Sequence, residues 1–241
     1  MKTIIHRAGD RGHADHGWLN AHHSFSFANW YDENKIQFGM LRVLNDDIVA
    51  AGQGFGTHPH NNMEIITIIL KGALQHKDNM GNGSVILPGD VQVMSAGTGV
   101  LHSEFNPSAT EDVNLFQLWI FPKENGIKPR YDQKTFDSNQ RKNNIQLLAS
   151  GFKKDAELYI HQDAAISISA LDKGQTINYN VNKNGNGVYL LVIEGTVEIN
   201  GELLLKRDAM GITDSNSFII KSKSDKDNYS DEILIIEVPM E

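Results

Sequence analysis

Short apolar runs alternate along the chain with clusters of polar, glycine and proline residues. Runs that are rich in β-branched residues and bounded by turn-forming residues are typical of β-strands. In the first half this pattern predicts strands over residues 22–30, 36–44, 63–70, 85–87, 91–94, 100–102 and 113–120. The polar residues 45–47 are interpreted as the turn after the second of these strands, and residues 1–35 as otherwise irregular. Regular short strands with turns between them indicate a β-sandwich or a β-barrel.

A strongly polar connection separates this first run of strands from a second one. It covers residues 123–150, and the strands predicted beyond it are residues 157–160, 165–170, 188–193 and 233–238. Helix signals are sparse throughout the sequence. We therefore predict an all-β chain of two similar halves, an N-terminal domain over residues 1–135 and a C-terminal domain over residues 136–241.

Composition excludes several classes of function. The formal net charge of −8 does not suit phosphate backbones or anionic lipids, so we expect no nucleic-acid partner and no membrane partner. The absence of cysteine excludes disulfides, thiolate metal sites and cysteine nucleophiles. The N-terminus lacks the apolar core of a signal peptide and no apolar run approaches membrane-spanning length, so a cytoplasmic protein is expected.

Four polar residues stand out because of their spacing. His58 and His60 are two residues apart, and so are His102 and Glu104, and a glycine-rich segment precedes each pair. Alternate residues of a β-strand point to the same side, so each pair presents both of its side chains to one face. If both faces meet at a common centre, three imidazoles and one carboxylate surround it, and this donor set suits a transition metal.

A buried polar cluster without metal is the alternative for these four residues. Each buried histidine would then need hydrogen-bond partners of its own. The repeated spacing on two separate strands favours the metal site. We expect His13, His16, His22 and His23 to make hydrogen bonds in loops or beside the site rather than to bind metal, since the adjacent His22 and His23 would point to opposite faces of a strand.

The two halves of the chain can be compared as an internal repeat. Residues 66–72 resemble residues 189–195, and each segment is a predicted strand that ends at a glycine. When the halves are superposed on these glycines and on a later aspartate, the four candidate ligand positions are occupied in the second half by Val181, Lys183, Ile220 and Ser222. The sequence therefore predicts a single metal site, in the N-terminal half.

Several motifs resemble a known family. Residues 52–72 and 89–106 resemble the two cupin motifs, although seven residues, one more than usual, separate Glu64 from Gly72, and Ser95 replaces the usual proline. More specific segments make the chain similar to the pirin family of two-domain cupins with one metal site, and in particular to bacterial pirin-like quercetin 2,3-dioxygenases. These segments are residues 15–18, 23–28, 54–60, 63–67, 96–104, 119–122 and 126–131.

The resemblance implies a fold and a ligand set. The expected fold is an all-β bicupin of two jelly-roll-like barrels packed together, with few short helices and, in the C-terminal domain, no metal ligands. The implied ligands of one divalent transition metal are His58, His60, His102 and Glu104. Iron is the first expectation for that metal, and nickel, copper, manganese and zinc are the alternatives. Glu64 stands where general cupins have a carboxylate ligand, and here it is expected to lie beside the site.

The resemblance also implies an activity. The expected enzyme is a dioxygenase that cleaves flavonols such as quercetin, with uptake of O2 and release of CO, and Glu104 is the candidate that takes the proton of the substrate hydroxyl. Five apolar residues are candidates for the wall of a substrate pocket or, equally, for ordinary core positions. They are Phe25, Phe27, Met40, Leu101 and Trp119.

A non-enzymatic function is the alternative implied by the family. Some pirins resemble regulators that bind a protein partner and use the metal state as a switch. The acidic surface permits a protein partner but does not argue for one. We expect a monomer, because the two halves can cover each other's sheets.

Overall fold

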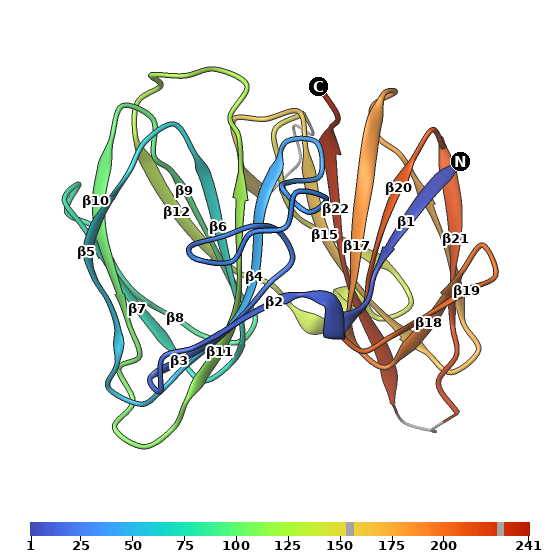
Figure 1. Ribbon diagram of the computed structural model, residues 1–241, viewed down its shortest axis with the longest axis horizontal. Helices are drawn as coiled ribbons and strands as arrows, with labels where there is room; N and C mark the ends of the chain where they lie inside the picture. Colours follow the sequence, from blue (N-terminus) through green and yellow to red (C-terminus); the bar gives the residue numbers. More distant parts are fainter. Residues whose placement is uncertain (153–156, 226–228) are drawn as a thin grey trace. The chain divides into compact units, whose positions relative to one another are not determined.

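The computed structural model describes residues 1–152, 157–225 and 229–241. In this part of the chain it consists of β-strands and two short 3-10 helices, η1 (Ala8–Asp10) and η2 (Ser138–Arg141) (Figure 1). None of the helices in the described part has the length and apolar character that a membrane crossing requires. The prediction of an all-β chain is confirmed.

The chain forms two compact units that exchange short segments. The N-terminal unit contains Gly12–Phe136 together with Leu158–Gln162, and the remaining residues form the C-terminal unit. This grouping differs from the predicted division after residue 135, because the first strand of the chain pairs with a strand near residue 210. The division into domains over residues 1–135 and 136–241 stays a prediction.

Two antiparallel sheets form the N-terminal unit, and they face each other in Figure 1. The larger has the strand order β12-β9-β6-β11-β4-β3-β2 and the smaller has the order β5-β10-β7-β8. Their bounds in chain order are β2 (Gly12–Asp15), β3 (Leu19–His23), β4 (Leu41–Val49), β5 (Gly54–His60), β6 (Glu64–Lys71), β7 (Leu74–Asp78), β8 (Gly83–Ile86), β9 (Asp90–Ser95), β10 (Val100–Phe105), β11 (Val113–Ile120) and β12 (Arg130–Thr135).

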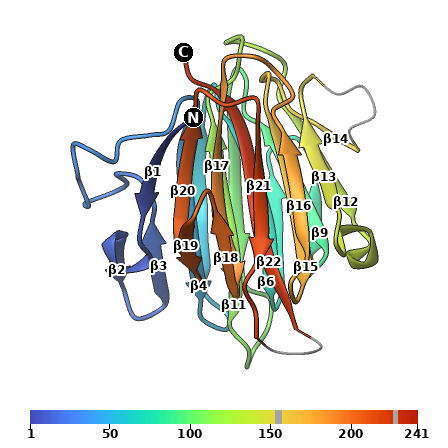
Figure 2. The ribbon, with the colours of Figure 1, turned by 90° about the vertical axis from the view of Figure 1, so that its right-hand side faces the viewer.

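The C-terminal unit repeats this topology. Its larger sheet contains the strands β1-β20-β17-β22-β15-β13 in this order, and its smaller sheet has the order β16-β21-β18-β19. Figure 2 shows β1 beside β20 at one edge of the larger sheet. The bounds are β1 (Lys2–His6), β13 (Ile145–Ser150), β15 (Ala165–Asp172), β16 (Thr176–Asn180), β17 (Asn186–Glu194), β18 (Thr196–Ile199), β19 (Glu202–Leu205), β20 (Ala209–Thr213), β21 (Ser217–Ser222) and β22 (Ser230–Pro239), while β14 (Leu158–Tyr159) belongs to the N-terminal unit.

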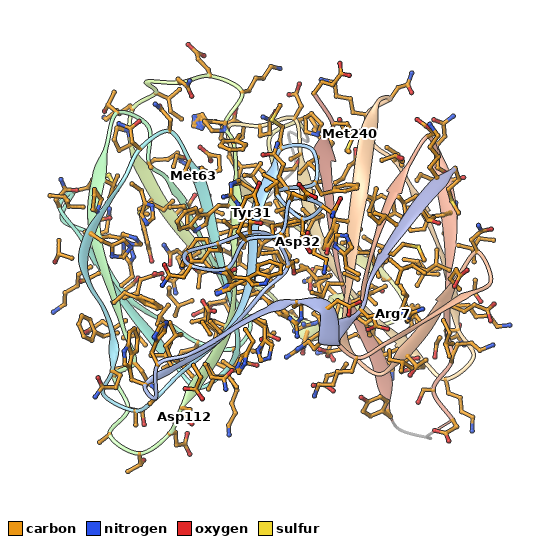
Figure 3. All side chains as sticks on the ribbon, in the orientation of Figure 1. Arg7, Tyr31, Asp32, Met63, Asp112 and Met240 are labelled. Atoms are coloured by element: carbon orange, nitrogen blue, oxygen red, sulfur yellow. The ribbon has the colours of Figure 1, made fainter. Side chains whose placement is uncertain are left out.

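The interiors of the two units differ in chemistry. Side chains fill the space between the sheets of each unit (Figure 3). In the C-terminal unit the interior is a continuous apolar cluster, and Ile220 of β21 pairs there with Ile177 of β16. In the N-terminal unit the corresponding pair is His102 of β10 and His58 of β5. In the C-terminal unit the residue that corresponds to His58 is therefore Ile177, and not Val181 as expected.

Three predictions about local structure were wrong. Strand β4 continues through residues 45–47, where Asn45, Asp46 and Asp47 are 3%, 8% and 5% exposed, because side-chain hydrogen bonds of Asn45 with His23 and of Asp46 with Asn114 keep this polar segment in the sheet. Residues 1–35 contain β1, β2 and β3, which carry too few apolar residues for the pattern to show, and of the strand predicted over residues 22–30 only residues 22–23 lie in a strand. The expected connection over residues 123–150 contains β12 and β13.

Candidate metal centre

Three histidines converge between β5 and β10 of the N-terminal unit. These strands pair antiparallel, with His102 opposite His58 and Val100 opposite His60. The ring centroids of His58 and His102 lie 4.4 Å apart, those of His58 and His60 4.9 Å, and those of His60 and His102 4.8 Å. One ring nitrogen of each histidine lies within 4.8 Å of the other two. The structure thus brings together all three histidines that the spacing singled out.

The hydrogen bonds of His58 and His102 leave the Nε2 atoms of these two histidines available to bind a metal. His58 Nδ1 donates to the carbonyl oxygen of Gly56 at 2.8 Å, which leaves its Nε2 atom as the acceptor. Among the described residues, the buried Nε2 atom of His102 has no hydrogen-bond partner. A buried polar atom without a partner is costly. Three imidazoles arranged in this way fit a divalent transition metal.

Burial keeps the candidate ligands neutral. Burial and, to a smaller extent, the neighbouring His58 lower the pKa of His60 to about 4. Burial also lowers the pKa of His102 to about 3, assisted by His58, His60 and His76. Metal ligation requires the neutral imidazole. Near neutral pH these two histidines therefore need to lose no proton before they bind a metal.

Glu104 lies beside His102 and is held by a chain of hydrogen bonds. Its carboxylate oxygens accept from Gln117 Nε2 at 3.2 and 2.9 Å, and Trp119 Nε1 donates to Gln117 Oε1 at 3.1 Å. Burial raises the pKa of Glu104, and the hydrogen bond from Gln117 opposes this. A carboxylate oxygen of Glu104 comes within 4.8 Å of ring nitrogens of His102 and His76. The predicted role of Glu104 as the fourth ligand stays a prediction.

His76 was missed by the sequence reasoning. This residue of β7 is fully buried and stacks on Tyr131, with ring centroids 4.7 Å apart. Its Nε2 lies 3.3 Å from Asp78 Oδ2, and its Nδ1 lies 3.4 Å from the Nδ1 of His102. If His76 donates from Nε2 to Asp78, its Nδ1 accepts the proton of His102 Nδ1, which leaves His102 Nε2 free for a metal. The two-residue spacing of His76 and Asp78 was the available signal.

Glu64 does not lie beside the metal centre, contrary to expectation. Its Oε2 atom accepts from Ser95 Oγ at 2.8 Å and from the backbone N–H of His161 at 3.1 Å. The next residue, Ile65, packs in a cluster that includes Trp119. Since side chains alternate along a strand, Glu64 points away from that cluster. Burial raises the pKa of Glu64 to about 7, against the hydrogen bonds from Ser95 and His161.

The additional histidines make hydrogen bonds and ring contacts. His13 Nε2 lies 3.2 Å from Asn20 Oδ1, and the rings of His13 and His22 stack with centroids 4.6 Å apart. His23 Nδ1 lies 3.0 Å from Asn45 Oδ1. Within the described residues, none of these histidines belongs to a group that could hold a metal. Hydrogen bonding is what the sequence predicted for them.

A cavity of about 250 Å³ adjoins the three histidines inside the N-terminal unit. Phe27 and Trp119 are in its wall with ring centroids 5.4 Å apart, as predicted, whereas Phe25, Met40 and Leu101 are not. Phe25 is a core residue and Leu101 is 44% exposed. The wall consists of Leu19, Ala21, His23, Phe27, Asn45, Asp47, Phe55, His58, His60, Glu104, Gln117 and Trp119.

The close approach of β5 to β10 depends on Gly54. A Cβ atom at this position would lie 2.3 Å from the carbonyl oxygen of Glu104 and 2.5 Å from the Cα of Phe105. We expect Gly54→Ala to push the two strands apart, lower the free energy of unfolding by about 1–3 kcal/mol and weaken metal binding. Urea unfolding and metal titration measure the two effects.

Gly56→Ala is the matched control, because a Cβ atom there would have no neighbour within 4 Å. Both glycines lie on β5, so general loss of backbone freedom affects them alike. Equal effects of the two substitutions on metal affinity would contradict the steric explanation.

The whole chain matches known proteins. The family model described as pirin matches residues 5–120, and the model of the quercetinase C-terminal cupin domain matches residues 147–238. The chain is 45% identical to quercetin 2,3-dioxygenase of Escherichia coli K12 over 98% of both chains. It is 46% identical to a pirin-like protein of Caulobacter vibrioides, over 89% of this chain and 92% of that one.

A solved structure agrees with the fold and with the chemistry of the centre. The bacterial pirin YhhW of Escherichia coli in complex with nickel(II) superposes with a TM-score of 0.91, at 42% identity over 99% of each chain. This alignment covers both units of the chain. The chain therefore belongs to the pirin family, and its two units are the two cupin domains of that family.

Proposed function

We propose that the protein is a metal-dependent quercetin 2,3-dioxygenase. In this reaction the flavonol takes up one O2, and its central ring opens with loss of CO. The observation that carries the proposal is the histidine triad at the wall of an apolar cavity, in a chain 45% identical to the Escherichia coli quercetin 2,3-dioxygenase. A flat aromatic substrate and O2 are the partners that this function requires.

One divalent metal per chain is proposed to bind His58, His60 and His102, with Glu104 as the fourth ligand. The neutral imidazoles and the unpartnered His102 Nε2 support this assignment. Imidazole and carboxylate donors suit iron and nickel alike, and the nickel complex of the bacterial pirin supports nickel as a metal for the first experiments. When bound, the metal supplies a Lewis acid toward a substrate oxygen and a site for dioxygen.

Glu104 is proposed to take the proton of the substrate's 3-hydroxyl. Its carboxylate lies in the cavity wall, so a bound hydroxyl comes within hydrogen-bond reach of it. Gln117 donates hydrogen bonds to both carboxylate oxygens, and Trp119 donates one to Gln117, so the carboxylate of Glu104 keeps one orientation.

Aromatic rings in the cavity wall are proposed to position the flavonol. Trp119 lies edge-on to His60, with ring centroids 4.9 Å apart, and to Phe27. Phe55 lies on the same wall as His58. These apolar faces fit the flat rings of a flavonol and exclude water from the reacting atoms.

Oxygen consumption tests the function directly. Protein loaded with nickel or iron is mixed with quercetin, and O2 uptake, CO release and metal content of the same sample are measured. We expect about one metal per chain, since the site has a single histidine triad. We also expect equal amounts of O2 consumed and CO released, since each flavonol takes up one O2 and loses one CO. Metal-replete protein that consumes no O2 with any flavonol would contradict the proposed activity and turn attention to a protein partner.

A further inference from the structure

Asp47 is a buried carboxylic acid in the cavity wall that no assigned role explains. It lies on β4, its side chain is 5% exposed, and it lines the same cavity as His58, His60 and Glu104. Among the described residues, its Oδ1 atom has no hydrogen-bond partner. A buried carboxyl oxygen that faces a cavity without a partner is either solvated there or meets a polar group of a ligand.

The polar side chains next to Asp47 on the same strand form hydrogen bonds with other side chains of the protein. Asn45, two residues earlier on the same face, has its Oδ1 3.0 Å from His23 Nδ1. Asp46, on the opposite face, accepts from Asn114 Nδ2 at 2.9 Å. In the larger sheet Asp47 stands opposite Ala21 on β3 and Leu115 on β11, which offer no side-chain donor. The unpartnered oxygen thus results from apolar neighbours on both adjoining strands.

The position of Asp47 relative to the histidines suits a single elongated ligand. Asp47 belongs to the larger sheet, and His58, His60 and His102 belong to the smaller sheet that faces it. Facing sheets lie about 10 Å apart, so a flat two-ring or three-ring molecule between them can contact both. The remaining wall near Asp47 is apolar, with Leu19, Ala21 and Phe55.

The protonation state of Asp47 makes it a hydrogen-bond donor as well as an acceptor. Burial and, to a smaller extent, the carboxylates of Asp46 and Glu104 raise its pKa to about 8. At neutral pH the side chain is therefore mostly the neutral acid, which can donate to one phenolic oxygen and accept from a phenolic hydroxyl.

We propose that Asp47 determines substrate specificity by hydrogen-bonding a second phenolic hydroxyl of the substrate, remote from the hydroxyl that gives its proton to Glu104. The proposal rests on the proposed dioxygenase function and names its substrate class as polyhydroxylated flavonols. A site that hydrogen-bonds a substrate hydroxyl discriminates strongly against an analogue without it, because the buried polar group of the protein is then left unpaired.

Two substrates and three variants, each compared with wild type, test this role. Quercetin carries several hydroxyls, whereas 3-hydroxyflavone carries only the one at which cleavage occurs. For wild type, Asp47→Leu, Asp47→Asn and the control Asp46→Asn, kcat and KM are measured with both substrates, together with metal content and thermal midpoint. Asp47→Leu removes all hydrogen bonding by this side chain, while Asp47→Asn keeps a donor and an acceptor. The asparagine variant still tests the proposal if the leucine variant does not fold.

We expect Asp47→Leu to lower the ratio of kcat/KM for quercetin to that for 3-hydroxyflavone by about ten- to a hundred-fold, mainly through KM for quercetin. Asp47→Asn should lower the ratio less, and Asp46→Asn should leave it within about two-fold of wild type, because Asp46 faces away from the cavity. Equal losses for both substrates, or an unchanged ratio, would overturn the proposal.

Anaerobic binding separates this proposal from the proposed activity. The dissociation constants of quercetin and 3-hydroxyflavone are measured with nickel-loaded wild type and Asp47→Leu in the absence of O2. Failure of wild type to consume O2 contradicts the dioxygenase, but a preference for quercetin that disappears in Asp47→Leu still supports the role of Asp47. Wild type that binds both compounds equally, or neither of them, would overturn it.

Discussion

Replacing His102 by alanine is expected to remove the bound metal and, with it, flavonol-dependent oxygen uptake. His102 supplies the buried Nε2 atom that has no partner among the described residues, and its ring centroid lies 4.4 Å from that of His58 and 4.8 Å from that of His60. Loss of one of three nitrogen ligands should lower metal affinity by more than about a hundred-fold, since even the outer partners of ligands contribute ten- to hundred-fold. Elemental analysis after gel filtration and oxygen uptake measure the two losses.

His13→Ala is the control for this substitution. His13 contacts Asn20 and His22 and has no place in the cavity wall. It should leave metal content and turnover within about two-fold of wild type, as surface substitutions usually do. A His102→Ala protein that keeps a full complement of metal would place the metal elsewhere and contradict the assigned centre.

Glu104→Gln is expected to lower kcat by about 10²–10⁴-fold, the range that a positioned general base contributes. Glutamine keeps the size of the side chain but cannot take the substrate's proton. One of the two terminal atoms of the glutamine side chain is an amide nitrogen, which cannot accept a hydrogen bond from Gln117 as a carboxylate oxygen does. Turnover is measured at saturating nickel, so that a weaker fourth ligand does not limit the rate.

Glu64→Gln is the matched control, because Glu64 is equally buried but bonds to Ser95 and His161 instead of facing the cavity. It should change the thermal midpoint and leave kcat almost unchanged. An unaltered kcat in Glu104→Gln at full metal occupancy would eliminate Glu104 as the base and leave it only the role of ligand.

The sequence predicted the histidine triad because two simple rules act together there. Residues two apart on a strand share a face, and the antiparallel register sets His102 opposite His58. The same rule applies to His76 and Asp78, but only the pairing of β10 with β7, which sets His102 opposite Asp78, shows that they adjoin the centre. Sequence spacing alone carries no information on which strands become neighbours.

The polar residues 45–47 illustrate a second limit of sequence reasoning. Asn45, Asp46 and Asp47 have the composition of a turn, and so they were interpreted as one. In the structure they continue β4, since one of them faces a polar side chain of β11 and two face the cavity. A cavity inside a barrel exists only after both sheets have formed. Polar strand residues that line it therefore resemble loop residues in the sequence.

The pairing of β1 with β20 has a consequence for synthesis of the chain. Lys2 stands opposite Thr213, so β1 finds its partner strand only after about 200 further residues of the chain have been made. The N-terminal unit, by contrast, has all of its strands once Gln162 has emerged. The cupin that carries the histidine triad can thus close during translation, while residues 1–11 remain without their sheet until β20 has been made.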